Sequence, residues 1–144
     1  MFTPDEVAGV VDLFGALSRA DLETALSELA YRRGEDPPED DVDAALSAFA
    51  LVGVDRDDDR LLVPGPTAFP ELPEGAEDLP HILDAEGRTP DREPVVDAAL
   101  ARFREAAVRA ATREDAARAA ELVDVSYDLE AWGVRDLPGL RDRL

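Results

Sequence analysis

The densest group of potential metal ligands is the acidic segment GVDRDDDRLLV. Its residues Asp55, Asp57 and Asp59 alternate like the first ligands of a calcium-binding EF-hand loop. Such a loop needs a glycine at its sixth position and a glutamate at its twelfth, where this chain has Arg60 and Pro66. We therefore predict no metal site here, and we interpret the aspartates as the solvent-exposed tip of a β-hairpin.

The remaining residue types give no catalytic constellation. Cysteine is absent and His81 is the only histidine, so neither a thiolate nor a histidine pair can form. The chain has no glycine-rich phosphate loop, no G-x-S-x-G and no H-E-x-x-H motif. With 34 carboxylates available, any chosen pair is more simply explained as surface. We predict a protein that is not an enzyme and has no cofactor, in which His81 is hydrogen-bonded to backbone.

The charge balance is unusual. The 34 acidic residues comprise 20 aspartates and 14 glutamates, and all 15 basic residues are arginines, which gives a net charge of −19. This composition resembles that of cytosolic proteins of extremely halophilic archaea, in which salt screens the mutual repulsion of carboxylates. No apolar run is long enough to span a membrane, and no basic signal region precedes the first helix. We expect a halophilic, cytoplasmic protein that does not enter a membrane.

Residues 1–64 are expected to form a winged helix-turn-helix-like region. Thr3 and Glu6 suit a capping box at the start of a first helix, and Ser18 suits the start of a second, which Gly34 would end. A short third helix follows in DDVDAALSAF. The segments ALVGVD and RLLVPG then form a hairpin with a polar tip of four to six residues. Three helices followed by a hairpin is the order of a winged helix.

The rest of the chain is expected to complete one compact, mainly helical body. Residues 65–92 are rich in proline but also apolar, so we expect them to form a strap packed across the body through Phe69, Leu72, Leu79, Ile82 and Leu83. Residues 93–144 are expected to form a helical cap. Within this cap, Thr112 with Asp115 would start a second helix, and Ser126 would start a further segment.

Charge argues against the DNA binding that a winged helix suggests. Residues 1–64 carry 16 acidic residues and 5 arginines, and the third helix begins with carboxylates where DNA-reading side chains would lie. Under the DNA-binding alternative, Arg56 and Arg60 near the hairpin tip would be the phosphate contacts. Overall acidity alone does not exclude nucleic acid, because molar salt removes most of the counterion-release contribution to affinity.

Three arginines of the C-terminal region form the candidate docking surface. Arg102, Arg109 and Arg113 are spaced at i, i+7 and i+11, close to one face of a helix. One interpretation pairs them with the acidic first half of the chain. The other makes them a docking surface for an acidic protein partner or a second copy. We therefore expect a non-catalytic protein-interaction or regulatory adaptor, the alternative being a DNA-binding transcription regulator.

The whole chain also resembles a group of small uncharacterised acidic proteins of haloarchaea. The segment FPELPEGAEDLPHIL, residues 69–83, is the part most similar to that group. The resemblance implies a halophilic origin and covers the full length of the chain. It implies no activity.

Overall fold

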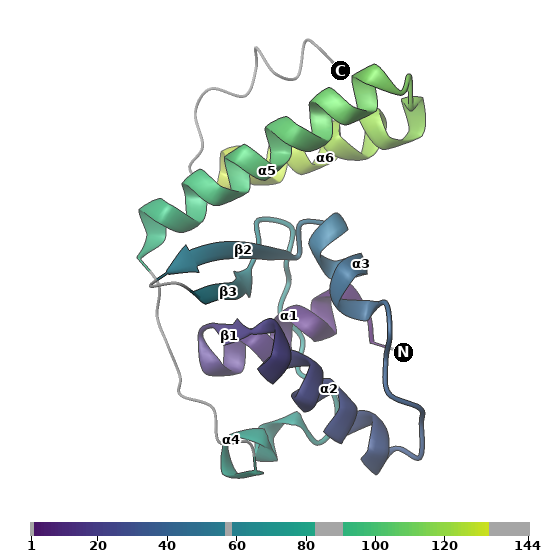
Figure 1. Ribbon diagram of the computed structural model, residues 1–144, viewed down its shortest axis with the longest axis vertical. Coiled ribbons are helices and arrows are strands. Elements are labelled where there is room, and N and C mark those ends of the chain that lie inside the picture. Colours follow the sequence, from purple (N-terminus) through teal and green to yellow (C-terminus); the bar gives the residue numbers. More distant parts are fainter. Residues whose placement is uncertain (1, 57–58, 83–90, 133–144) are drawn as a thin grey trace.

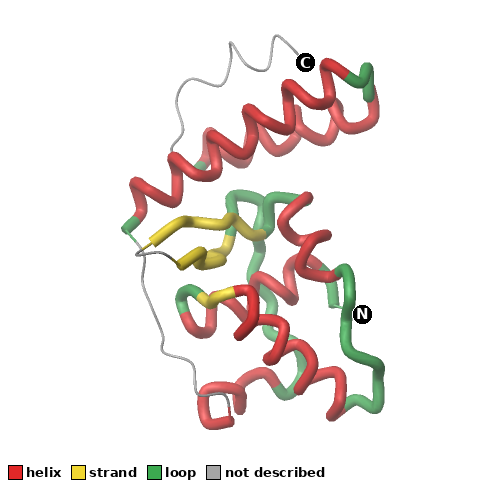
Figure 2. The backbone as a smooth tube through the Cα atoms, viewed as in Figure 1, coloured by secondary structure: helices red, strands yellow, loops and turns green. Residues whose placement is uncertain are grey.

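The computed structural model describes residues 2–56, 59–82 and 91–132. A small sheet lies between two helical layers, as Figures 1 and 2 show. One layer holds α1 (Pro4–Phe14), α2 (Arg19–Arg32) and α3 (Asp41–Ser47), and the other holds α5 (Arg92–Thr112) and α6 (Ala116–Ala131). The prediction of a mainly helical fold is confirmed, as are three helices followed by a hairpin in the first 64 residues.

The sheet has three antiparallel strands in the order β1-β3-β2. They are β1 (Leu17–Ser18), β2 (Leu51–Arg56) and β3 (Asp59–Pro64). The two-residue strand β1, which pairs with Leu61 and Leu62 of β3, was not predicted because it is too short to show a two-residue hydrophobic period. Within the described part of the chain, strand β2 has a neighbour on one side only, so it is an edge strand there.

The hairpin tip is shorter than the sequence suggested. The strands continue to Arg56 and Asp59, which are register partners, and Asp55 lies opposite Arg60. Opposite charges facing each other across the ladder favour this extension, and the prediction of a four- to six-residue tip is wrong. Two residues, 57–58, join the strands, so the central aspartates of the acidic segment lie outside the described residues.

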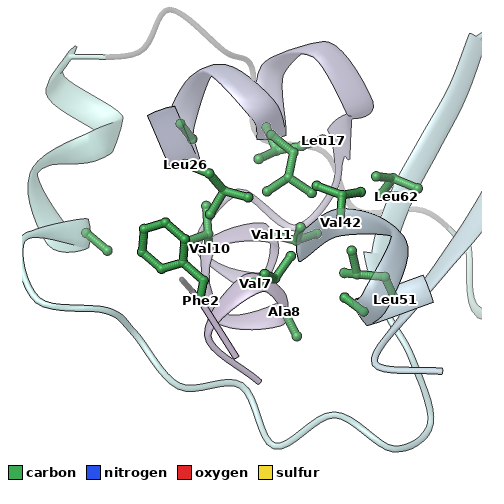
Figure 3. Packing of buried hydrophobic residues seen from close by; sticks show 14 of the residues in the cluster. Phe2, Val7, Ala8, Val10, Val11, Leu17, Leu26, Val42, Leu51 and Leu62 are labelled. Carbon is green, nitrogen blue, oxygen red and sulfur yellow. The ribbon is translucent and has the colours of Figure 1, made fainter. Parts of the chain in front are cut away.

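The first helices form where their capping residues place them. Thr3 accepts a hydrogen bond from the Glu6 amide, and the Glu6 carboxylate accepts one from the Thr3 amide, which completes the predicted capping box. Ser18 caps α2 by accepting from the Asp21 amide. Figure 3 shows the core that these helices share with α3 and one face of the sheet, which includes Phe2, Val7, Val10, Val11, Leu17, Leu26, Val42, Leu51 and Leu62.

The proline-rich segment packs against α1, through only some of the residues expected. The Glu71 amide donates to the Asp5 carbonyl at 3.0 Å, and a Cβ added at Gly9 would lie 2.2 Å from the Glu71 carbonyl oxygen. Phe69 and Leu72, expected to be packed, are 81% and 50% exposed. Leu79 is buried as expected, at the start of the short helix α4 (Leu79–Ile82), and Ala76 of the preceding turn η1 (Ala76–Asp78) is buried with it. Residues 83–90, including the expected contact Leu83, lie outside the described residues, as does the side chain of Ile82.

The C-terminal helices are longer than predicted. Thr112 is the last residue of α5 rather than the cap of the next helix, and Asp115 caps α6 by accepting from the Arg118 amide at 3.0 Å. Ser126 is fully buried inside α6 and starts no new segment. The two helices turn at Glu114, which has a positive φ of 52°. Their buried faces cover the second face of the sheet, and the core there contains Phe49, Val52, Val54, Leu61, Val63, Ala99, Phe103, Leu122 and Leu129.

Candidate functional site

Contacts at Phe49 hold the α5–α6 pair against the rest of the molecule. The ring of Phe49 meets that of Phe103 edge to face at a centroid distance of 6.3 Å. Arg118 of α6 lies over the same ring at 6.0 Å and donates from Nη2 to the Ser47 carbonyl at 3.0 Å. Phe49 has a positive φ of 62°, which is rare for a bulky residue, and it is almost fully buried. The strained backbone is therefore held by packing on both sides.

Four arginines converge beside this contact. Arg102, Arg109 and Arg113 of α5 line a cavity of about 250 Å3 together with Arg118 of α6. We call this the arginine cavity. The side chains recur along α5 at nearly whole helical turns, and the turn at Glu114 brings Arg118 back against them. Two carboxylates, Glu105 and Asp115, also line the cavity. The lining charge is therefore positive in a chain of net charge −19.

The arginines of the cavity differ in how far they are neutralised. Arg102 is 4.0 Å from Glu105, and Arg118 is 3.0 Å from Glu121. Among the described residues, no carboxylate lies within 4.0 Å of the guanidinium groups of Arg109 and Arg113. The described part of the chain also contains no ion pair that joins Arg102, Arg109 or Arg113 to the acidic first half. Asp115 caps α6 and forms no ion pair within 4.0 Å with a described arginine.

A second hollow of about 560 Å3 adjoins the arginine cavity and shares Arg102 and Glu105 with it. We call it the edge groove, because it runs along the outer edge of β2. One wall is α5, through Ala98 and Ala101. The opposite side is formed by residues of α2, α3 and the sheet, namely Arg19, Leu46, Leu51, Gly53, Asp55, Arg60 and Leu62.

Two arginines of the edge groove are held in defined positions. The side chain of Arg60 crosses Gly53 so closely that a Cβ there would lie 2.3 Å from Arg60 Nε. Arg19 donates to Asp43 and to Glu23, each at 2.9 Å. The hydrogen bond from Arg19, with its positive charge, lowers the pKa of Asp43, and the same bond is the main cause of a raised pKa for Arg19.

The helix that would read DNA in a winged helix exposes no cation. The outward residues of α3 are Asp43, Ala44 and Ser47, and the residues just before this helix are acidic. Of the two arginines assigned to DNA contact, Arg60 lies within β3 and lines the edge groove. Arg56 ends β2, and its side chain lies outside the description.

No metal site is evident in the described chain. Nowhere in residues 2–56, 59–82 and 91–132 do three or more histidine, aspartate or glutamate side chains gather closely enough to hold an ion. His81 belongs to the short helix α4, and the surroundings of its side chain lie outside the description, so its backbone hydrogen bond stays a prediction. Within the same residues, every helix is too short or too polar to cross a membrane.

Comparison with known proteins places the chain in a family. A family model matches residues 5–144, which is nearly the entire sequence. The chain belongs to the family of unknown function DUF7109. No curated protein and no solved structure matches it. The similarity of its first 64 residues to a winged helix therefore stays a prediction.

Two arginines important to the surface of this DUF7109 chain were not found from the sequence. Arg118 joins the arginine cavity because the chain reverses at Glu114, and the sequence analysis did not predict where this reversal lies. A usable signal was Asp115 itself, since aspartate is a preferred N-cap residue and marks the start of α6. Arg19 reaches the edge groove through the tertiary contact of α2 with α3, for which the sequence carries no local signal.

Proposed function

We propose that the protein is a non-catalytic adaptor that binds an acidic protein partner through the arginine cavity and the exposed residues around it. The observation that carries the proposal is the convergence of four arginines, two of them without an ion-pair partner among the described residues, in a strongly acidic chain. Arginine suits such a surface because its planar guanidinium group binds carboxylates through two parallel hydrogen bonds.

The surface next to the cavity supports a protein partner in particular. Val108 is 66% exposed on α5 and lies in a shallow, open depression with Arg104, Arg109 and Thr112. An apolar side chain ringed by arginines suits a protein surface, where aromatic or aliphatic contacts combine with charge. A second copy of the chain could meet the same requirement through its acidic first half.

DNA-binding transcription regulation is the alternative function. It draws support from the order of the first three helices and the hairpin. The outward face of α3 weakens it, because Asp43 would face the phosphates and Arg118 ties the end of this helix to α6. If the hairpin contacted only the phosphates of DNA and no bases, the contact would depend on Arg56 of β2 and Arg60 of β3.

Purification of tagged protein from its source cells tests the adaptor proposal. We expect a partner that is retained at fixed stoichiometry by the native chain and lost from an Arg109→Ala/Arg113→Ala variant. Arg32→Ala/Arg33→Ala is the matched control, because it changes the net charge equally and leaves intact both the lining of the arginine cavity and the depression around Val108. Equal loss of the partner from both variants would contradict the proposal, since it would show a response to charge alone.

A DNA titration separates the two functions. The native chain is titrated with duplex DNA in molar potassium chloride, and no saturable binding is expected. Saturable, sequence-dependent binding that weakens in Arg56→Ala and Arg60→Ala would favour the transcription regulator and overturn the adaptor.

A further inference from the structure

The outer edge of β2 presents unpaired backbone groups in a regular order. The Gly65 amide donates to the Ala50 carbonyl at 2.7 Å, which makes Ala50 and Gly65 a hydrogen-bonded pair at the start of the hairpin. Hydrogen-bonded and non-hydrogen-bonded pairs alternate along an antiparallel ladder. The amide and carbonyl groups of Leu51, Gly53 and Asp55 therefore point away from β3, toward the edge groove.

The groove is open at Gly53 and Asp55, whereas Leu51 at its inner end is almost fully buried. Gly53 is half-buried and Asp55 is exposed, and both line the hollow of about 560 Å3. No backbone hydrogen bond to another part of the described chain is made by Leu51, Gly53 or Asp55 on this side. An exposed strand edge of this kind is a template for pairing with a further strand.

We propose that the edge groove binds an extended acidic segment of the protein partner, which adds to the sheet as a fourth strand beside β2. This inference rests on the proposed adaptor function and names how the partner binds. Main-chain hydrogen bonds to Leu51, Gly53 and Asp55 supply the affinity, as in other cases of strand addition. The continuity of the groove with the arginine cavity, through Arg102 and Glu105, places the two binding surfaces side by side.

The walls of the groove define the sequence that fits. The face of the sheet that carries Leu51, Gly53 and Asp55 also carries Arg60. Arg19 lies on the same side but is already paired with Asp43 and Glu23, so Arg60 is the cation on this side that selects an acidic residue. The other face meets the small side chains of Ala98 and Ala101 on α5. Because alternate residues of a strand point to opposite faces, the bound segment should alternate acidic residues with small apolar ones.

A single strand fits the site better than a second copy of the chain. In a dimer formed through β2, each edge would have to enter a groove already flanked by α5 and by Arg19 and Leu46 of the other copy. Two chains of net charge −19 would also repel each other more than a short peptide and one chain do.

The test begins with peptide selection on the full-length protein. A displayed library of random peptides of about twelve residues, enough to pass the whole of the six-residue β2, is panned on the native chain. We expect the enriched peptides to show acidic residues with a two-residue period. The most enriched peptide, made synthetically, is then the probe, and its binding should slow hydrogen exchange at the amides of Gly53 and Asp55.

Proline substitution identifies the backbone contact. Gly53→Pro removes an outward N–H and costs no ladder hydrogen bond, since Gly53 is a non-hydrogen-bonded residue of an edge strand. Gly53→Ala is the matched control, because it also adds a Cβ that displaces Arg60 and it keeps the N–H. We expect Gly53→Pro to bind the probe peptide about tenfold more weakly than Gly53→Ala does, as the loss of one backbone hydrogen bond predicts. If Gly53→Pro fails to fold by circular dichroism, Asp55→Pro and Asp55→Ala form an equivalent pair.

Three results would overturn the inference: no enriched peptide, peptides with the three- to four-residue period of a helix, or equal affinity of the proline and alanine variants. A concentration-dependent dimer that Gly53→Pro abolishes would also overturn it and assign the edge to a second copy. The same variants test the adaptor function independently of the added strand. Partner binding that is lost in Arg109→Ala/Arg113→Ala and kept in Gly53→Pro would retain the adaptor and reject the added strand.

Discussion

At the scale of single residues, the best-defined buried polar contact is made by Asp41. Its carboxylate is 8% exposed and accepts a hydrogen bond from the Phe2 amide at 2.8 Å. The contact links the start of α3 to the segment before α1, thirty-nine residues away in sequence. Asp41 is also the first residue of α3, where a negative charge interacts favourably with the helix dipole.

Replacing Asp41 should therefore reduce stability in a graded way. We expect Asp41→Ala to lower the free energy of unfolding by about 1–3 kcal/mol, because the Phe2 amide would be left buried without an acceptor. Asp41→Asn should cost less, since its amide oxygen still accepts the bond and only the charge is lost. Urea denaturation of the native chain and both variants measures the difference. Equal losses in the two variants would show that charge, and not the hydrogen bond, is what the site requires.

The sequence alone identified the arginines of the cavity where helical spacing was enough to place them on one face. Arg102, Arg109 and Arg113 were selected by helical spacing alone, and the structure places all three around one cavity. Their use in docking stays a prediction. Arg118 and Arg19 escaped notice because their positions depend on a helix turn and on a contact between helices. Such tertiary relationships leave no periodic signal in a single sequence.

At the scale of elements, the packing of the proline-rich segment on α1 depends on Gly9. A Cβ at this position would lie 2.2 to 2.8 Å from backbone atoms of Glu71, closer than any real contact. Glycine inside a helix normally lowers stability, and the close approach of the two backbones explains why Gly9 is present in α1.

Whether Gly9→Ala raises or lowers the free energy of unfolding tests this packing. In an isolated helix, Gly9→Ala should stabilise α1 by about 1 kcal/mol. In the folded protein we expect the opposite, a loss of about 1–3 kcal/mol, because the backbone at Glu71 must move away. Thermal and urea unfolding of the variant decide between the two. A more stable variant would mean that the segment does not rest on α1.

The elements themselves were predicted well where capping residues and hydrophobic period agree. Thr3 and Ser18 start α1 and α2 as expected, and the hairpin has its predicted strands. The errors arose where local signals compete. Thr112 resembles a helix cap, yet the alanine-rich α5 continues through it. Phe69 and Leu72 were expected to be buried because they are apolar, but the backbone contact at Gly9 leaves both on the surface.

At the scale of the whole molecule, charge is distributed unevenly along the chain. Residues 1–97 hold 25 acidic residues and 7 arginines, whereas residues 98–144 hold 9 and 8. The acidic first part of the chain includes the loop before α3, in which Asp36 and Glu39 are exposed. The screening length of salt solution is about 30 Å at 0.01 M and about 3 Å at 1 M, so dilute salt leaves nearly all of these carboxylates repelling one another.

This repulsion predicts that folding requires salt. Native stability is only about 5–15 kcal/mol, so unscreened repulsion can offset much of it. We expect cooperative folding in molar potassium chloride and loss of helical circular dichroism below roughly 0.1 M, where screening becomes weak.

Asp36→Asn/Glu39→Gln should move the folding midpoint to lower salt. Glu105→Gln/Glu121→Gln changes the net charge equally but removes partners of Arg102 and Arg118, so its midpoint should not fall. A melting temperature independent of salt would refute both the repulsion argument and the halophilic interpretation.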